Sequence, residues 1–270
     1  MRIIAVTGSA SGIGAAVVRL VRRAGERVVG IDLHEAEILA DLGAAGGRTR
    51  AMQELAALTG GRLDGLVTCA GLSSAAHDEA RVLAVNYFGT AELLRGLRPL
   101  LAQGTRPAAV AVSSWAMLQA TPLPEAIEAC LAFDEPRALE LVLADSRAGK
   151  LWPAYATSKS ALARLVRQLA PRPDWAGCGI ALNAIVPSVT RTPMVAHTFA
   201  SAEATRALLA AVPSPMGRVA EPEDVAEPIA YLVSGAARLL TGQIIFVDGG
   251  LDALRRPFDT LAPLAPQRWT

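Results

Sequence analysis

Tyr155 and Lys159 are the residues whose types and spacing carry the clearest chemical meaning in this sequence. Residues four apart lie on one face of a helix, so we expect the Lys159 ammonium beside the Tyr155 hydroxyl. A free tyrosine loses its proton near pH 10, and a cation about 4 Å away at an effective dielectric of about 20 stabilises the phenolate by roughly 4 kcal/mol. After screening, we expect the pKa of Tyr155 to fall by about two pH units. The pair therefore predicts general acid–base chemistry near neutral pH.

A glycine-rich segment near the start of the chain indicates what this tyrosine works beside. Gly8, Gly12 and Gly14 stand between a strand-like run at residues 3–6 and a helical pattern that starts at Ile13. The first glycine permits a tight turn, the second lets the backbone approach a pyrophosphate, and the third lets the helix pack closely on the sheet. Phosphate then meets the free amides at the positive end of the helix. The segment predicts a dinucleotide site.

An acidic residue ends the second strand-like run, at residues 28–31. Asp32 stands where a carboxylate accepts hydrogen bonds from the adenine ribose hydroxyls and repels a 2′-phosphate. No Arg or Lys lies in the glycine-rich segment, so NAD is favoured over NADP. An ordinary solvated carboxylate is the alternative for Asp32. Asp41 and Leu42 follow the third run and are expected to bracket the adenine.

The order of the remaining elements predicts how these residues are positioned. Continuous apolar runs are typical of strands covered on both faces, hence of a parallel sheet with helices on each side. We expect an α/β chain, a single doubly wound domain over residues 1–270 with about seven strands. The expected strands are residues 3–6, 28–31, 38–40, 66–69, 109–112, 181–186 and 244–247, and the clearest helices are 13–24, 77–102, 154–170 and 222–234.

Two segments depart from this alternation. Residues 115–152 are too long for a simple strand-to-helix connection, and 126–143 has the composition of one or two helices. This insertion covers the surface of the domain, or it forms an oligomer contact or an active-site wall. Residues 193–216 are apolar and predict a lid over an apolar substrate, with Met194 as a contact. A plain amphipathic helix packed on the core is the alternative.

Composition excludes several function classes. The net charge is +1 with no long run of like charge, which argues against a nucleic-acid binder. No apolar stretch reaches membrane-spanning length, and the first strand-like run leaves no room for a signal peptide. The cysteines and histidines are scattered, so we expect reduced thiols, no metal site and a cytoplasmic location; they are Cys69, Cys130, Cys178, His34, His77 and His197.

Taken as a set, the motifs resemble the short-chain dehydrogenase/reductase family over essentially the whole chain. They are residues 7–14, Cys69-Ala70-Gly71, Asn86, Ser113-Ser114, Tyr155 to Lys159, 183–187, Thr192-Pro193 and 242–250. Within the family, the sequence is most similar to bacterial 3α-hydroxysteroid dehydrogenase/carbonyl reductases. These share the Cys-Ala-Gly-Leu turn, a Val-Asn-Tyr-Phe-Gly run and a long segment before the tyrosine.

The resemblance implies a catalytic tetrad of Asn86, Ser114, Tyr155 and Lys159. Tyr155 exchanges the proton with the substrate oxygen, Lys159 keeps the tyrosine acidic, and Ser114 stabilises charge on the reacting oxygen. Asn86 holds a water that links Lys159 to solvent, or merely caps a bend. Ser113 competes with Ser114, and the family favours the second serine of the pair.

The family also implies a set of cofactor contacts. In addition to Tyr155 and Lys159, these are Gly8, Ser11, Gly12, Ile13, Gly14, Asp32, Asp41, Leu42, Cys69, Ala70, Gly71, Pro187, Thr190 and Thr192. The last three follow the sixth strand, where the family holds the nicotinamide carboxamide. Two residues depart from the pattern: Cys69 replaces an asparagine near the adenosine, and Ser188 replaces a glycine near the nicotinamide. Ser114, Tyr155 and Met194 are the expected substrate contacts.

The expected function is therefore an NAD-dependent interconversion of a secondary alcohol and a ketone. A hydroxysteroid or another bulky cyclic or aromatic substrate is favoured, and a smaller terpene or aryl alcohol is the alternative. A lyase of the halohydrin dehalogenase type shares the scaffold, but the intact glycines, Asp32 and Lys159 count against it. A non-catalytic NAD sensor is the third hypothesis. We expect a homo-oligomer, preferably a dimer, with a tetramer as the alternative.

Overall fold

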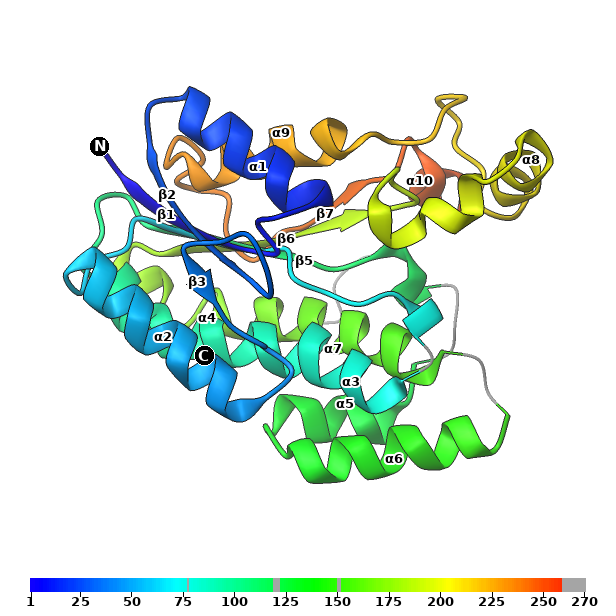
Figure 1. Cartoon of the computed structure of the whole chain (residues 1–270), viewed down its shortest axis with the longest axis horizontal. Coiled ribbons are helices and arrows are strands. Elements are labelled where there is room, and N and C mark those ends of the chain that lie inside the picture. Colours follow the sequence, from blue (N-terminus) through cyan, green and yellow to red (C-terminus); the bar gives the residue numbers. More distant parts are fainter. Residues whose placement is uncertain (77, 119–121, 150–151, 259–270) are drawn as a thin grey trace.

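A seven-stranded parallel sheet forms the centre of the molecule (Figure 1). The structure is a computed structural model and describes residues 1–76, 78–118, 122–149 and 152–258, so the last twelve residues of the expected domain lie outside it. The strand order is β3-β2-β1-β4-β5-β6-β7. The strands are β1 (Ile3–Thr7), β2 (Arg27–Asp32), β3 (Ile38–Leu39), β4 (Gly65–Thr68), β5 (Ala108–Val112), β6 (Ala181–Pro187) and β7 (Ile244–Val247). All seven expected strands are confirmed.

Helices cover both faces of the sheet because alternate strand residues point to opposite sides. On one face α1 (Gly12–Arg23) and α9 (Pro222–Val233) pack on Ile4, Val67 and Ile185. On the other face α2 (Ala45–Thr59), α4 (Thr90–Leu101) and α7 (Pro153–Leu169) cover the intervening strand residues. This is the doubly wound fold that the sequence predicted. Its strand order reverses between β1 and β4, where such sheets open a crevice at the strands' carboxyl ends.

The helix expected at residues 77–102 is divided in three. After residue 77, which lies outside the described part, α3 (Glu79–Leu83) runs into a π-helical segment, Ala84–Gly89, and then into α4. A π-helical turn leaves part of the regular backbone hydrogen bonding unmade and is frequent at functional sites. Asn86 stands in this segment and is fully buried.

The insertion contains the two helices that its composition allowed. A 3₁₀ turn (Trp115–Leu118) precedes α5 (Pro124–Leu131) and α6 (Glu135–Arg147), whereas 119–121 and 150–151 lie outside the described residues. Helix α5 packs on α7, and α6 packs on α3. The buried Arg48 of α2 anchors the insertion through an ion pair of 2.6 Å to Glu135 of α6, and it also pairs with Glu92 of α4 at 2.8 Å.

The expected lid projects from the carboxyl ends of the strands (Figure 1). It consists of a 3₁₀ segment, Pro193–Phe199, and α8 (Ala202–Ala211). Helix α8 has no buried residue, so it is not an amphipathic helix packed on the core. Three short elements complete the described chain: 3₁₀ turns at Ser74–Ala76 and Ala176–Cys178, and α10 (Leu251–Arg255).

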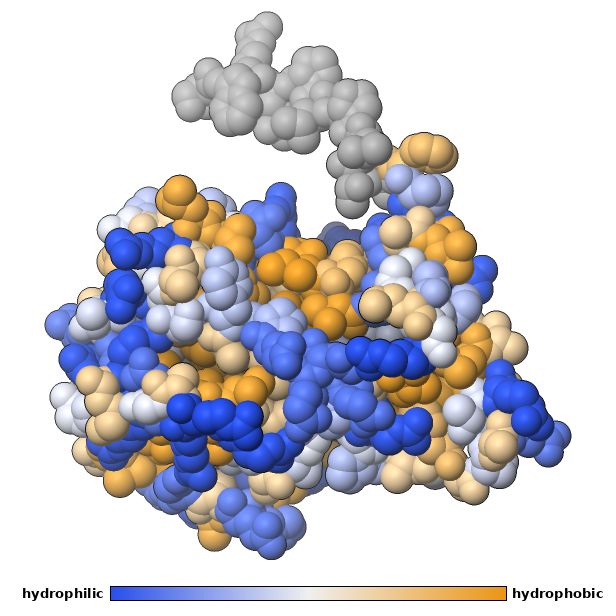
Figure 2. Space-filling view, turned by 90° about the horizontal axis from the view of Figure 1, so that it is seen from above, coloured by the Kyte–Doolittle hydropathy of each residue, from blue (hydrophilic) through white to orange (hydrophobic). Residues whose placement is uncertain are grey.

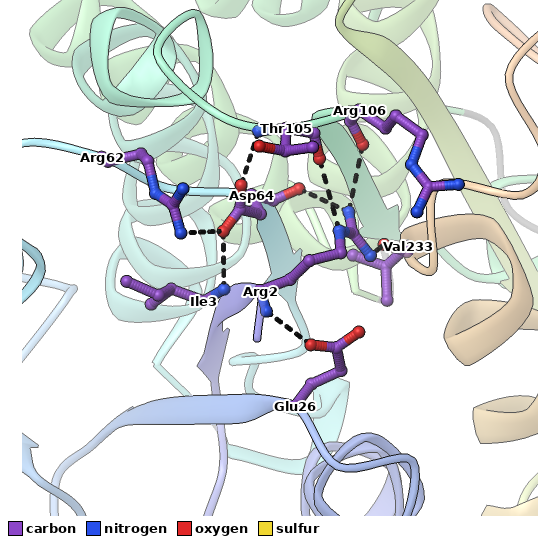
Figure 3. A network of polar contacts seen from close by, with 8 residues as sticks. All are labelled: Arg2, Ile3, Glu26, Arg62, Asp64, Thr105, Arg106 and Val233. Carbon is purple, nitrogen blue, oxygen red and sulfur yellow. Dashed lines mark hydrogen bonds and ion pairs between the residues drawn. The ribbon is translucent and has the colours of Figure 1, made fainter.

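Two buried charged residues tie together the other end of the sheet (Figure 3). The Arg2 guanidinium donates to the carbonyls of Val233 at 2.7 Å and Asp64 at 2.8 Å. The fully buried Asp64 carboxylate accepts from the amides of Ile3 at 2.7 Å and Thr105 at 2.6 Å. Buried polar groups are tolerated when they are hydrogen-bonded in this way. The network fixes the starts of β1, β4 and β5 far from the crevice.

Candidate active site

A cavity of about 1220 Å³ opens at the carboxyl ends of the strands. Every residue that the sequence predicted to contact cofactor or substrate lines it, and Asn86 is the one predicted site residue that does not. The lining set comprises Gly8, Ser11, Gly12, Ile13, Gly14, Asp32, Asp41, Leu42, Cys69, Ala70, Gly71, Ser114, Tyr155, Lys159, Pro187, Thr190, Thr192 and Met194. Apolar surface gathers in a hollow toward the end of the molecule that carries α8 (Figure 2).

The glycine-rich turn between β1 and α1 forms one end of this cavity. Gly8 has φ of +66°, and a Cβ there would lie 2.8 Å from the Ala70 amide nitrogen. A Cβ on Gly14 would lie 2.0 Å from the Gly8 carbonyl oxygen, so a side chain would push the helix off the turn. Ser11 precedes α1 but its side chain does not cap the helix. The first amides of α1 therefore keep hydrogen-bonding capacity for an anion.

Acidic side chains stand beside this turn. The Asp32 carboxylate accepts hydrogen bonds from the amides of Ala10 at 2.9 Å and Leu33 at 2.7 Å. These two donors orient the carboxylate and leave lone pairs for a ribose diol. Asp41 accepts from the Gly43 amide at 2.9 Å and pairs with Arg81 at 3.0 Å. Arg81 also lines the cavity and was not predicted from the sequence.

Ser114 and Tyr155 meet in the middle of the cavity. The Ser114 side chain is hydrogen-bonded to the Tyr155 side chain, while the Ser113 hydroxyl donates to the Lys159 carbonyl at 2.8 Å. The choice of Ser114 over Ser113 therefore follows the geometry. The Lys159 ammonium donates to the Val112 carbonyl at 3.0 Å, and its nitrogen lies 5.8 Å from the centre of the Tyr155 ring.

The expected effect of Lys159 on Tyr155 is wrong for this arrangement. Burial raises the pKa of Tyr155, and only the hydrogen bond from Ser114 works in the opposite direction. The helical spacing does bring Lys159 to the same face, but its ammonium turns to the Val112 carbonyl. Burial also lowers the pKa of Lys159 from 10.5 to about 8, an effect that the nearby Cys69 partly offsets. Desolvation thus decides the direction of both pKa shifts.

Asn86 lies behind this pair. Its amide oxygen accepts from the Leu72 amide at 2.7 Å, and its amide nitrogen donates to the Leu72 carbonyl at 3.0 Å. The side chain therefore holds the chain after β4 against the π-helical segment. A Cβ built on Gly71 would lie 3.1 Å from the Asn86 oxygen and 3.8 Å from the Lys159 nitrogen, which places the two residues close together. The predicted water that joins them remains a prediction.

The two departures from the family pattern lie on the cavity wall. Cys69 contacts the core beneath α1 and lies near Lys159, and burial raises the pKa of its thiol to about 12. Its carbonyl carbon lies beside Gly8 of the glycine turn, at 2.9 Å from where a Cβ on that glycine would stand, and its expected place near the adenosine remains a prediction. Ser188 donates its backbone amide toward the Val247 carbonyl at 3.4 Å, and Thr190 donates its hydroxyl to the Ser188 carbonyl at 3.2 Å. These bonds shape the turn after β6.

Sequence reasoning missed several lining residues that come from the insertion. Trp115, Asp145 and Trp152 line the cavity on the side of Ser114 and Tyr155. The adjacency of Trp115 to Ser114, and of Trp152 to the start of the Tyr155 helix, is the signal that could have found them. The insertion is therefore in part an active-site wall, one of the readings left open above.

Comparison with known proteins agrees with this geometry. Residues 2–126 match a family described as short chain dehydrogenase, and residues 141–252 match one described as Enoyl-(Acyl carrier protein) reductase. The chain is 41% identical over 262 residues to the 3-alpha-hydroxysteroid dehydrogenase/carbonyl reductase of Comamonas testosteroni, covering 95% of this chain and 99% of that protein. The chain belongs to the short-chain dehydrogenase/reductase family.

Other members are similar over most of their length. The crystal structure of the 3-alpha-hydroxysteroid dehydrogenase from Pseudomonas sp. B-0831 complexed with NADH matches with a TM-score of 0.84 at 45% identity, covering 94% of this chain and 98% of that one. The cis-4-hydroxycyclohexanecarboxylate dehydrogenase of Sinomonas cyclohexanicum is 34% identical over 277 residues, or 94% and 97% of the two chains. This short-chain dehydrogenase/reductase is thus an oxidoreductase of CH–OH groups.

Two further findings bear on the excluded classes. Among the described residues, no group of three or more His, Cys, Asp or Glu side chains is placed to hold a metal ion. Within that same part of the chain, no helix combines the length and the apolar character that crossing a membrane requires.

Proposed function

We propose that this enzyme interconverts a secondary alcohol and a ketone with NAD(H). The observation that carries the proposal is the hydrogen-bonded pair of Ser114 and Tyr155 in the same cavity as the glycine turn and Asp32. The residues present fit a dinucleotide. Gly8 and Gly14 leave space that a Cβ would fill, and no side chain caps the first amides of α1, so they can donate hydrogen bonds to a phosphate. Asp32 favours a ribose diol over a 2′-phosphate, hence NAD over NADP.

The chain's own residues handle the proton. A bound NAD(H) would supply the hydride acceptor for oxidation of the carbinol carbon and the hydride donor for reduction of the carbonyl carbon. Tyr155 accepts the hydroxyl proton in oxidation and donates it to the carbonyl oxygen in reduction. Ser114 donates a hydrogen bond to the same oxygen and stabilises the charge that develops there. Lys159 would contact the nicotinamide ribose, and an ammonium released from the Val112 carbonyl toward Tyr155 would stabilise the phenolate that burial disfavours.

A bulky, apolar cyclic or aromatic substrate suits this cavity best. Its substrate end is formed by Trp115, Trp152, Met194, Val195 and Val212, whose side chains are predominantly apolar. The named activities of the similar enzymes from Comamonas testosteroni and Pseudomonas sp. B-0831 support a hydroxysteroid. A smaller terpene or aryl alcohol is the second candidate, because the wall and the lid come from segments that vary freely in length and sequence.

The lid over residues 193–216, a homodimer and a cytoplasmic location complete the proposal. The exposed position of α8 beside the cavity supports a lid, since an element with few buried contacts opens at low cost. Cysteines without disulfides support a reducing compartment: Cys69, Cys130 and Cys178 are all free thiols.

The decisive experiment is Tyr155→Phe with Tyr231→Phe as the matched control, since Tyr231 is 55% exposed and outside the cavity. We expect Tyr155→Phe to lose at least 100-fold in kcat on a panel of steroid and aryl ketones, while NADH fluorescence titration gives an unchanged Kd. Near-normal turnover by this variant would refute the mechanism. Wild-type protein that fails to bind NADH would favour a lyase, and binding without turnover of any ketone would favour a sensor.

A further inference from the structure

Trp152, which lines the cavity, departs from the usual preferences for a helix N-cap residue and for left-handed backbone. It stands immediately before α7, yet its indole makes no cap on that helix. Its backbone is left-handed, with φ of 58° and ψ of 42°. Asn, Asp, Ser or Gly would suit both demands better, because these residues cap helices and Asn and Gly tolerate this conformation. A bulky residue at positive φ is an outlier that carries a cost.

The chain around Trp152 maintains this conformation. The Glu79 carboxylate of α3 accepts a hydrogen bond from the Ala154 amide at 2.8 Å, so a residue from another helix caps the start of α7. Pro153 fixes the next φ and needs no partner for an amide hydrogen. The strained residue is thus held in place from outside, which is typical of functional positions.

The indole itself is open to a ligand. Trp152 is 52% exposed and lines the cavity three residues before Tyr155. No aromatic ring or cation of the described residues stacks on it. The residue that follows Ser114, Trp115, lines the same cavity but is 8% exposed and packs into the core. Of these two tryptophans, Trp152 is therefore the one with a large free apolar surface.

We propose that Trp152 is a substrate-specificity residue whose indole stacks on a flat ring system of the ketone or alcohol. The inference rests on the proposed function and narrows its substrate class to ring compounds that extend beyond the reacting carbon. Tryptophan offers such a surface at low conformational cost, and offset stacking adds to the area that it buries. A short acyclic ketone reaches Ser114 and Tyr155 but leaves the indole untouched.

The test compares two ketones, 2-tetralone and 2-pentanone, in three variants. Trp152→Ala is expected to lower kcat/KM for 2-tetralone about 10-fold and to change that for 2-pentanone less than 2-fold. Trp152→Phe retains a ring and is expected to recover most of the loss. Trp152→Asn removes the backbone strain, so it should lose selectivity as Trp152→Ala does while unfolding at a higher temperature.

Glu35→Asn is the matched control for strain. Glu35 also has a positive φ, of 51°, but does not line the cavity, so its replacement should raise the unfolding temperature and leave both ketones unaffected. Equal losses on the two ketones, or no loss on either, would overturn the proposal.

A binding readout keeps the inference separate from the proposed function. The stacked 2-tetralone should quench indole emission in the wild type and several-fold less in Trp152→Phe, which retains the other three tryptophans, Trp115, Trp175 and Trp269. A wild type that quenches without reducing any ketone would refute the function and leave the stacking intact. Equal quenching in both proteins would refute the stacking, whatever the turnover.

Discussion

Replacing Lys159 by Met should make the protein more stable at pH 7 while it removes activity. Burial lowers the pKa of Lys159 from 10.5 to about 8. At about 1.36 kcal/mol per pH unit, holding this ammonium in the fold costs about 3 kcal/mol. Methionine matches the length of the side chain and has no charge. It leaves the Val112 carbonyl without its donor, which costs about 1 kcal/mol, so we expect a net gain of about 2 kcal/mol.

The free energy of unfolding of the wild type should depend on pH in a definite direction. Below pH 8 the lysine is protonated in both the folded and the unfolded state, and the cost is fully present. Between about pH 8 and 10.5 the unfolded chain keeps the proton that the folded protein has lost, so the free energy of unfolding rises with pH. Cys69 opposes this above pH 9, because burial raises its pKa from 9.0 to about 12 and the unfolded chain ionises first. The net rise in the wild type is confined to about pH 8–9.

Urea unfolding of wild type and Lys159→Met from pH 6.5 to 10 isolates the effect. Contributions of Cys69 and the tyrosines largely cancel in the difference, which should shrink steadily above pH 8. Arg164→Met, an exposed position on the same helix, is the matched control and should show a flat difference. A variant that is less stable than wild type at pH 7, or a difference that does not depend on pH, would refute the reasoning.

Two further substitutions test other parts of the molecule. Asp32→Ser removes the carboxylate that the Ala10 and Leu33 amides orient. In steady-state assays kcat/KM with NAD should fall at least about 10-fold, and the ratio of kcat/KM with NAD to that with NADP should fall at least about 100-fold. An unchanged ratio would show that Asp32 does not contact the ribose. Asp64→Asn places an amide N–H against one of the two backbone amides that Asp64 accepts from, and it removes the ion pair with Arg62, so it should cost about 2–4 kcal/mol in urea unfolding with kcat unchanged at 20 °C. A loss below about 0.5 kcal/mol would show that the network of Figure 3 contributes little.

The regular part of the fold could be predicted because local sequence and tertiary environment agree there. Strand β5 (Ala108–Val112) is buried along its whole length, and its sequence is a continuous apolar run; β6 (Ala181–Pro187) is equally buried, and only Asn183 interrupts its apolar run. The roles of Gly8 and Gly14 could also be predicted, because a Cβ at either position would clash with nearby backbone and the turn therefore requires glycine there. The predicted binding residues converge because parallel strands end at one edge of the sheet.

What could not be predicted depends on tertiary contacts that no local pattern encodes. The π-helical segment Ala84–Gly89 has the composition of ordinary helix, and its geometry is matched by the bonds of Asn86 to Leu72. The strained backbone of Trp152 likewise depends on a capping carboxylate from Glu79, which is distant in sequence. The direction of the Lys159 ammonium was missed because spacing fixes the face of a helix, whereas the choice of partner depends on burial and on the nearby Val112 carbonyl.

The resting arrangement of Tyr155 and Lys159 is the consequence of placing two ionisable groups in an apolar wall. Each group is pushed toward its neutral form: the pKa of Tyr155 is raised and that of Lys159 is lowered, both mainly by burial. At pH 7 an ammonium with a pKa of about 8 is still mostly charged, but it is directed at the Val112 carbonyl and does not offset the burial of the Tyr155 phenol. Acidification of the tyrosine therefore needs Lys159 to turn away from the Val112 carbonyl, and this requires new hydrogen-bond acceptors near the ammonium. The hydroxyls of a nicotinamide ribose bound in the cavity that Lys159 and Tyr155 line would supply acceptors of that kind, so cofactor binding and acidification of Tyr155 should be thermodynamically linked.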